Sequence, residues 1–231
     1  EALKYYKKSA DKGNELAMLN YATIIENEDK EEAQNYYKKS ADKGNELAML
    51  NYATIIENED KEEALKYYKM SADKGNDIAM NNYAYMLNNC EGVEEPDKEE
   101  ALKYYKLSAE KGNIDAMNNY AQMLQKGEGI EEPNQKEALK YYKIAADKGN
   151  DSAMLNYAKM LEEGEGIDEP DKEEALKYYK KSADQGNMYA MCCYAKMIDK
   201  GEGLDEPNKD EAVLYYKMAA DQGNEIAMYI Y

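Results

Sequence analysis

The sequence predicts an all-α protein, a right-handed superhelical solenoid built from antiparallel helix hairpins. The first observation is a block, E-A-x-x-Y-Y-K-x-[SA]-A-[DE]-x-G-N, that recurs seven times along the chain. The second observation is a set of helix start and stop signals at fixed places in every repeat. Hairpins that recur at a fixed period bury their apolar faces by stacking on one another, so the expected fold is a solenoid.

The glycine of each block divides the chain into repeats, and we expect residues 1–231 to form a single repeat array. Successive blocks are 31 residues apart twice and then 37 residues apart four times. The predicted parts are a half repeat at 1–13 (a second helix), 31-residue repeats at 14–44 and 45–75, 37-residue repeats at 76–112, 113–149, 150–186 and 187–223, and a truncated first helix at 224–231.

The first helix of each repeat is predicted from its cap and its apolar spacing. In repeat 113–149, Asn113 is expected to cap a helix whose small and apolar residues fall three and four positions apart. Gly127 follows this run at a place where a left-handed residue ends a helix. The repeat therefore opens with one amphipathic helix.

The second helix of the same repeat begins at a capping box. Asn134 is followed three residues later by Glu137, and Pro133 marks the turn just before them. The small residues Ala17, Ala22, Ala33 and Ala41 of repeat 14–44 let the two helices approach closely, and Tyr and Met fill the spaces between hairpins. The corresponding boxes in the other repeats are Asp29/Glu32, Asp60/Glu63, Asp97/Glu100, Asp171/Glu174 and Asn208/Glu211.

At these positions the chain resembles the Sel-1-like repeat family, which is related to tetratricopeptide repeats. The matching residues in repeat 113–149 are Ala116, Gly127, Gly129, Ile130, Ala138, Tyr141, Tyr142, Ala145, Ala146 and Gly149. The chain departs from the family pattern where Tyr120 and Ala121 replace Leu-Gly, where Cys90 replaces a glycine, and where the two short repeats lack the G-x-G turn. The resemblance implies a scaffold or adaptor that binds other proteins.

Composition excludes several classes of function. The formal net charge is −18, so the chain would repel nucleic acid, and we expect no nucleic-acid partner. The chain contains no histidine to act as a general base, and its carboxylates are explained as caps and turns, so we expect neither an enzyme nor a cofactor. The three cysteines lack metal-ligand spacing, which predicts no metal site and favours a cytoplasmic location. No run of apolar residues is long enough for direct membrane insertion.

The candidate binding site is the surface of the first helices, which line the concave groove in tetratricopeptide geometry. Asparagine recurs there, and its amide can both donate to and accept from a peptide backbone. Two readings stay open: the asparagines bind a partner, or they form bonds within the hairpin. The predicted partner-binding residues are Asn20, Asn51, Asn82, Asn119, Asn156, Leu19, Leu50, Asn81, Tyr85, Asn118, Gln122, Leu155, Lys159, Cys192 and Lys196.

Two functions follow from this reading. The first is a scaffold that binds a protein or peptide segment in the groove. The alternative is a structural spacer or assembly component that stacks end to end without a groove ligand, because a chain that starts at a second helix and stops inside a first helix leaves apolar faces open. In that case either the parent chain continues or another chain stacks there.

Overall fold

The computed structural model describes residues 1–230, and every regular element in that range is an α-helix. The chain forms two compact units, one of residues 1–113 and one from residue 114 onward. The first unit contains α1 (Ala2–Ala10), α2 (Glu15–Ile25), α3 (Lys30–Asp42), α4 (Glu46–Ile56), α5 (Lys61–Asp73), α6 (Asp77–Asn88) and α7 (Lys98–Glu110). The second contains α8 (Ile114–Lys126), α9 (Gln135–Asp147), α10 (Asp151–Glu163), α11 (Lys172–Asp184), α12 (Met188–Lys200), α13 (Lys209–Asp221) and α14 (Glu225–Ile230). The predicted all-α hairpin fold is confirmed.

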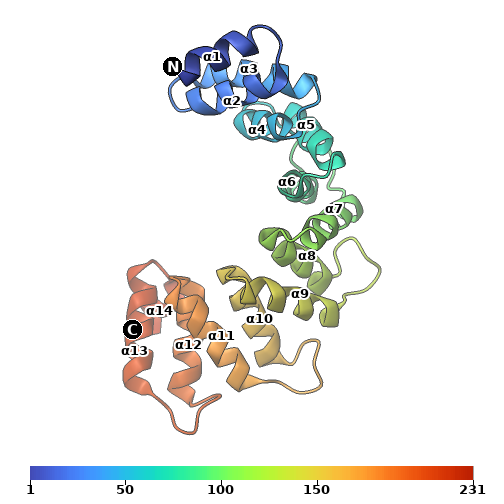
Figure 1. Ribbon diagram of the computed structural model, residues 1–231. Coiled ribbons are helices and arrows are strands. Elements are labelled where there is room, and N and C mark those ends of the chain that lie inside the picture. The colour runs from blue at the N-terminus through green and yellow to red at the C-terminus, as the bar shows by residue number, and fades with distance from the viewer. Residues whose placement is uncertain (231) are drawn as a thin grey trace. The chain divides into compact units, whose positions relative to one another are not determined.

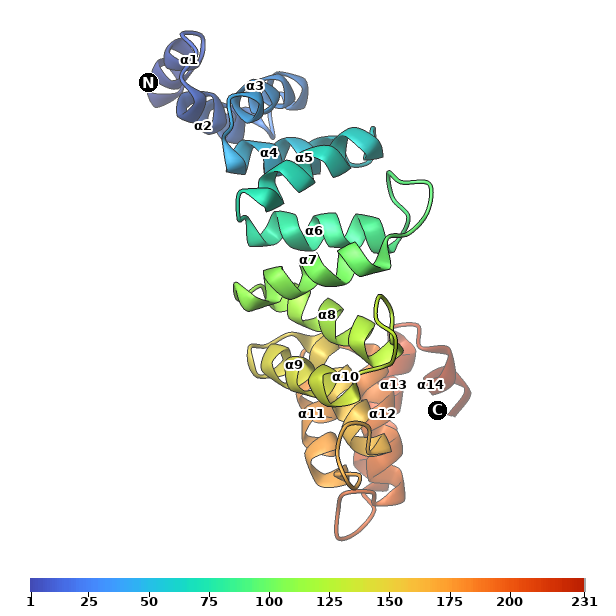
Figure 2. The same ribbon diagram turned by 90° about the vertical axis from the view of Figure 1, so that its right-hand side faces the viewer.

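Within each unit, every helix packs against the helix before it and the helix after it in the chain. Figure 1 shows α2 with α3 and α4 with α5 as antiparallel hairpins. Figure 2 shows the long turn between α6 and α7 projecting from the end of its hairpin. Each even-numbered helix is the first helix of a repeat, and each odd-numbered helix is a second helix.

The predicted capping boxes hold the starts of the second helices. The Asp29 side chain accepts a hydrogen bond from the Glu32 backbone nitrogen at 2.9 Å. Asn134 does the same for Glu137 at 3.1 Å, and its amide also donates to the Glu137 carboxylate. These bonds satisfy backbone donors that a helix leaves free in its first turn, so the boundaries follow directly from local sequence.

Small residues set how closely the two helices of a hairpin pack. Ala22 of α2 and Ala33 of α3 are fully buried. Ser40 is also buried in this interface, where its hydroxyl donates to the Glu15 carbonyl oxygen at 2.8 Å. The bond links the end of a second helix to the start of its own first helix, so a small polar side chain costs little in the core.

The six-residue turn of the longer repeats contacts the preceding repeat. Gly166 has φ of +78°, and a Cβ placed on it would lie 2.6 Å from the Gln135 carbonyl oxygen at the start of α9. Gly92 makes the same close approach to the Lys61 carbonyl oxygen. Only glycine fits this position, because the backbones touch there. Cys90 also adopts a positive φ, of 58°, where the family pattern has glycine.

Candidate protein-interaction surface

A joint of polar and aromatic side chains holds neighbouring repeats together on the second-helix side. Lys38 of α3 pairs with Glu63 of α5 at 2.7 Å and lies over the Tyr52 ring. Tyr52 packs edge-on against Tyr67, whose hydroxyl donates to Asp42 at 2.6 Å. Hydrogen bonds to Glu63 and Tyr52 raise the pKa of Lys38 above its usual value. The first tyrosine of each pair is therefore a structural contact between repeats.

The second tyrosine of each pair reaches the side of the first helices. The Tyr37 hydroxyl donates to Glu26 Oε2 at 2.8 Å and lies 3.1 Å from Thr23 Oγ1. Burial raises the pKa of Tyr37 to about 12, although the contacts with Thr23 and Asn51 lower it and Glu26 raises it. The equivalent bonds elsewhere join Tyr68 to Glu57, Tyr142 to Gln125 and Tyr179 to Glu162.

We define the first-helix surface as the exposed and half-buried side chains of α2, α4 and α6 in the first unit, and of α8, α10 and α12 in the second. On α2 the exposed residues Leu16, Asn20 and Thr23 fall four and three positions apart, which places them on one face of the helix. A depression of about 460 Å³ lies where α1 meets this face, lined in part by Tyr6, Leu16 and Asn20. The first helix α2 thus offers a mixed apolar and polar stripe.

Three predicted site residues do not belong to this surface. Leu19, Leu50 and Leu155 are each only 8% exposed and lie in the core. Three positions along an α-helix correspond to a rotation of about 60°, which is enough to place Leu19 on the side of α2 packed in the hairpin while Leu16 stays exposed. The exposed aliphatic residues of α2 are Leu16, at 57%, and Ile24, at 48%. The correction moves the apolar part of the surface to Leu16 and its counterparts.

The asparagine column lies on the first-helix surface, and some of its amides bond within the chain. Asn20 is exposed, while Asn51, Asn82, Asn119 and Asn156 are half-buried. On α6 and α8, Asn81 and Asn118 occupy the position that a buried leucine holds on α2. Both bond to members of the asparagine column: Asn81 donates to Asn82, and Asn156 donates to Asn118, both at 3.3 Å. An amide has four hydrogen-bonding positions, so these contacts leave capacity for a further partner.

The remaining predicted residues occupy the same surface with different chemistry. Tyr85 of α6, Gln122 of α8, Lys159 of α10 and Lys196 of α12 are exposed, and Cys192 is half-buried. Lys196 Nζ lies 3.9 Å from Glu162 Oε1 on the preceding first helix. The surface of the second unit therefore carries its own cations.

The tyrosines fill the spaces between hairpins, as the sequence predicts. The sequence analysis did not predict that the second tyrosine of a pair also donates a hydrogen bond to the polar residue at the end of a first helix, as Tyr37 does to Glu26. Glu26 and Glu57 precede their tyrosines by the same number of residues, and Gln125 and Glu162 do so in the longer repeats. This fixed pairing of a polar residue with the second tyrosine was the available signal.

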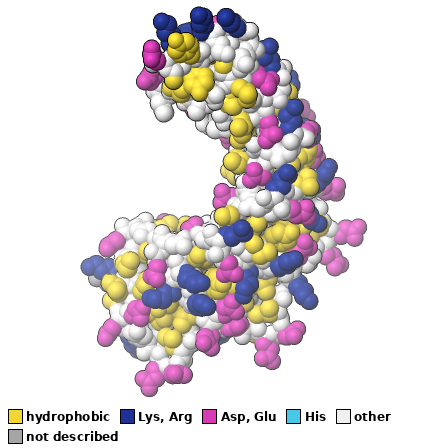
Figure 3. Space-filling model, in the orientation of Figure 1, with side chains coloured by type: hydrophobic (Ala, Val, Ile, Leu, Met, Phe, Trp, Pro, Cys, Tyr) yellow, Lys and Arg dark blue, Asp and Glu magenta, His cyan; other side chains and the backbone are white. Residues whose placement is uncertain are grey.

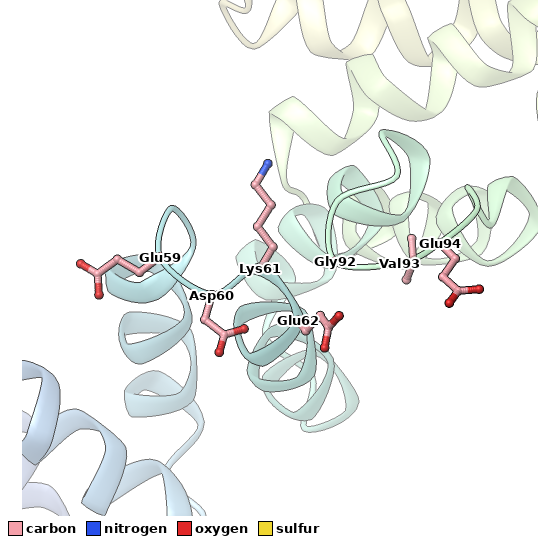
Figure 4. A pocket seen from close by; sticks show the side chains of 7 residues that line it. All are labelled: Glu59, Asp60, Lys61, Glu62, Gly92, Val93 and Glu94. Atoms are coloured by element: carbon pink, nitrogen blue, oxygen red, sulfur yellow. The ribbon is translucent and has the colours of Figure 1, made fainter.

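The acidic turns do not form a cage. In the pocket between the α4–α5 turn and the α6–α7 turn, Glu59, Asp60 and Glu94 point in different directions (Figure 4). Lys61 pairs with Glu91 at the same edge, at 2.9 Å. Within residues 1–230, no three His, Cys, Asp or Glu side chains come together in a way that could hold a metal ion. This edge behaves as a solvated, partly paired surface.

Stacked helical hairpins, whose joints recur from repeat to repeat and whose first-helix surface varies, define an α-solenoid repeat protein. The Sel1 repeat family model matches residues 1–14, 17–45, 48–76, 77–113, 114–150, 151–187 and 188–224. The chain belongs to the Sel1 repeat family. No curated protein matches the chain.

Solved structures with the same fold support this assignment. The chain resembles c5321, a protective antigen present in uropathogenic Escherichia coli strains, with a TM-score of 0.91 and 25% identity over 97% of this chain. The match covers 50% of c5321, so the chain spans about half the length of that protein. A Sel1 repeat protein from Oxalobacter formigenes matches with a TM-score of 0.78 and 26% identity. This match covers 90% of the present chain and 85% of the Oxalobacter chain.

Sel1 repeat proteins are generally protein-interaction scaffolds, and their solenoid is typically non-enzymatic. In the part of the chain that the structure describes, no helix is both long and apolar enough to span a bilayer.

Proposed function

We propose that this protein is an interaction scaffold that binds a segment of a partner protein on its first-helix surface. One observation carries the proposal. Leu16, Leu47 and Ile78 occupy the same position on three successive first helices and are about half exposed, whereas framework side chains such as Ala22 and Tyr37 are fully buried. Water-exposed aliphatic side chains in a row are a favourable place for a partner to bury its own apolar groups.

The asparagine column supports the same surface. Asn20, Asn51 and Asn82 lie one turn along from the aliphatic row on the same three helices. Amides beside apolar contacts can fix the backbone of a bound segment, since they pair with both its N–H and C=O groups. The combination offers apolar contact for affinity and hydrogen bonds for orientation.

An affinity capture with this chain as bait tests the proposal. The variant N20A/N51A/N82A alters the amides, and the control variant N35A/K66A/K103A alters three exposed side chains at one position of the second helices α3, α5 and α7. We expect the partner to be recovered by the unaltered chain and the control but lost from the asparagine variant. Equal recovery by all three baits would contradict the proposal, provided that circular dichroism shows equal helicity.

A second candidate function is end-to-end stacking with further repeats. Tyr5 of α1 is 67% exposed and Ile226 of α14 is 65% exposed, while the counterpart of Tyr5 in the next repeat, Tyr36, is buried. Sedimentation velocity over a range of concentrations tests this candidate. Growth in mass that is abolished by Tyr5→Ser and Ile226→Ser would support stacking, and a constant mass would contradict self-stacking.

A further inference from the structure

We propose that the first-helix surface of the first unit takes a basic segment that carries aliphatic side chains. The inference rests on the proposed function, because it names the chemistry of the partner bound by that same surface. Three features of α2, α4, α6 and the residues directly after them carry it: an exposed aliphatic row, the absence of lysine, and two fixed carboxylates that form no ion pair with a lysine in the described structure.

The aliphatic row is not required by the fold. Leu16, Leu47 and Ile78 are 57%, 51% and 48% exposed. The same position in the second unit holds Asp115, Ser152 and Tyr189. Because the repeats fold with polar residues there, the exposed aliphatic side chains of the first unit are free to serve a ligand.

The charges of the first unit are separated between its two kinds of helix. The segments 14–29, 45–60 and 76–97, which hold the first helices and the turns after them, contain thirteen carboxylates and no lysine. Every lysine of the first unit lies on a second helix or in the turn that follows one. Figure 3 shows lysines gathered along α1 at the top of the picture. The first helices of this unit and the turns after them therefore carry an excess of negative charge, although Glu59 and Glu91 in the turns pair with Lys30 and Lys61.

Two of these carboxylates are held in place by a tyrosine hydroxyl, although Glu57 also interacts electrostatically with Lys61, which pairs with Glu91. Glu26 and Glu57 each accept a hydrogen bond of 2.8 Å from a tyrosine hydroxyl, and within residues 1–230 neither forms an ion pair with a lysine. A carboxylate has further lone pairs for a charged donor, and its bond to tyrosine fixes its position before a ligand arrives.

The second unit shows how the chain neutralises the same carboxylate when it has a lysine. Glu162 is the counterpart of Glu26, and Lys196 of the following first helix lies 3.9 Å from it. In the first unit, the position equivalent to Lys196 holds Thr54 in the repeat after Glu26 and Tyr85 in the repeat after Glu57. The first unit thus lacks the first-helix lysine that the second unit places beside this carboxylate.

A lysine- or arginine-bearing segment completes this arrangement. Its cations would pair with Glu26 and Glu57, and its aliphatic side chains would cover Leu16, Leu47 and Ile78. Charge complementarity of this kind steers a partner and rejects competitors more than it adds affinity. An acidic segment of equal hydrophobicity would be repelled.

Three labelled peptides test the proposal by fluorescence anisotropy on the whole chain: four Gly-Leu-Lys units, four Gly-Leu-Glu units, and four Gly-Ser-Lys units. We expect the Gly-Leu-Lys peptide to bind most tightly, and its affinity to fall as salt rises because exposed charges are screened. Gly-Ser-Lys should bind more weakly, and Gly-Leu-Glu should not bind measurably.

Two variants at one position separate charge from shape. T54K supplies a cation beside Glu26, as Lys196 does beside Glu162, whereas T54Q adds a neutral side chain of similar length, as Gln122 has at this position. We expect T54K to weaken Gly-Leu-Lys binding by about fivefold, the scale of one exposed ion pair, and T54Q to leave it within about twofold. Leu47→Ser should weaken binding by about fivefold, from lost apolar burial.

The proposal is overturned if Gly-Leu-Glu binds as tightly as Gly-Leu-Lys, if T54K and T54Q have equal effects, or if Gly-Leu-Lys fails to bind. These results leave the proposed function standing when the affinity capture still depends on the asparagines. Loss of that dependence would remove the proposed function itself.

Discussion

The two tyrosines of each second helix have separate roles. The first tyrosine bonds to the aspartate that ends the preceding second helix, as Tyr67 does to Asp42 and Tyr104 does to Asp73. The second turns toward the first helices, where Tyr68 meets Thr54 and Glu57. Because adjacent helical residues point about 100° apart, one pair serves both the joint between repeats and the edge of the first-helix surface.

The Tyr67 hydroxyl offers a direct test of the joint. Tyr67→Phe should lower the free energy of unfolding by about 1.5–3 kcal/mol, because it leaves the Asp42 carboxylate without its buried donor. Chemical denaturation followed by circular dichroism measures the change. Tyr5→Phe is the control, since Tyr5 is 67% exposed, and its effect should be within about 0.5 kcal/mol. Equal effects of the two substitutions would contradict this role for Tyr67.

The helix boundaries were predictable from sequence because caps are local. Asp29 with Glu32 and Asn134 with Glu137 specify a helix start through bonds that span three residues. The burial of Leu19 was not predictable in this way. Leu16 and Leu19 are the same residue type on one helix, and only the rotation of α2 in its hairpin buries one and exposes the other. The lysine-to-glutamate pairs between repeats likewise depend on packing between segments distant in sequence.

The turn of the longer repeats depends on a glycine that touches the preceding repeat. Gly166→Ala should destabilise the protein by about 3 kcal/mol, because a positive φ is costly for alanine and its Cβ would meet the Gln135 carbonyl oxygen. Gly149→Ala is the matched control: it also has a positive φ, but nothing lies within 4 Å of its Cβ position. Its cost should be about 1 kcal/mol. Denaturation midpoints of the two variants compare them, and equal midpoints would show that the turn makes no such contact.

Cys90 holds a left-handed conformation at the end of α6 that the family pattern assigns to glycine. Cys90→Gly should stabilise the protein by about 1 kcal/mol, because glycine adopts φ near +58° without the penalty of a Cβ. The Cys90 sulfur makes only weak contacts with the Val93 and Glu94 carbonyl oxygens. Thermal unfolding measures the gain, with Cys192→Ala as a control for loss of a thiol. A fall in melting temperature for Cys90→Gly would show that the thiol contacts outweigh the backbone strain.

At the scale of the whole molecule, the repeated joints should make the folded state less stable at alkaline pH. Hydrogen bonding to Asp11 and burial raise the pKa of Tyr36 to about 12, and burial raises that of Tyr37 to about 12. The folded state therefore keeps protons that the unfolded chain loses above about pH 10. Lys38, whose pKa is also raised, contributes in the same direction.

We therefore expect stability that is fully present below about pH 10 to be lost as pH rises toward about 12. Tyrosinate absorbance and the helical circular dichroism signal, measured over one titration, should change together for the buried tyrosines. Complete tyrosine ionisation with an unchanged helical signal would contradict the structural role given to these hydroxyls.

We propose that a partner binds the first-helix surface rather than the second helices or the terminal helices α1 and α14. A photo-crosslinking residue placed in turn at Leu47, Lys66 and Tyr229 tests this most directly, because these positions lie on α4, α5 and α14. We expect the partner to be crosslinked from position 47 and not from positions 66 or 229. Crosslinking from position 66 or 229, with none from position 47, would contradict it.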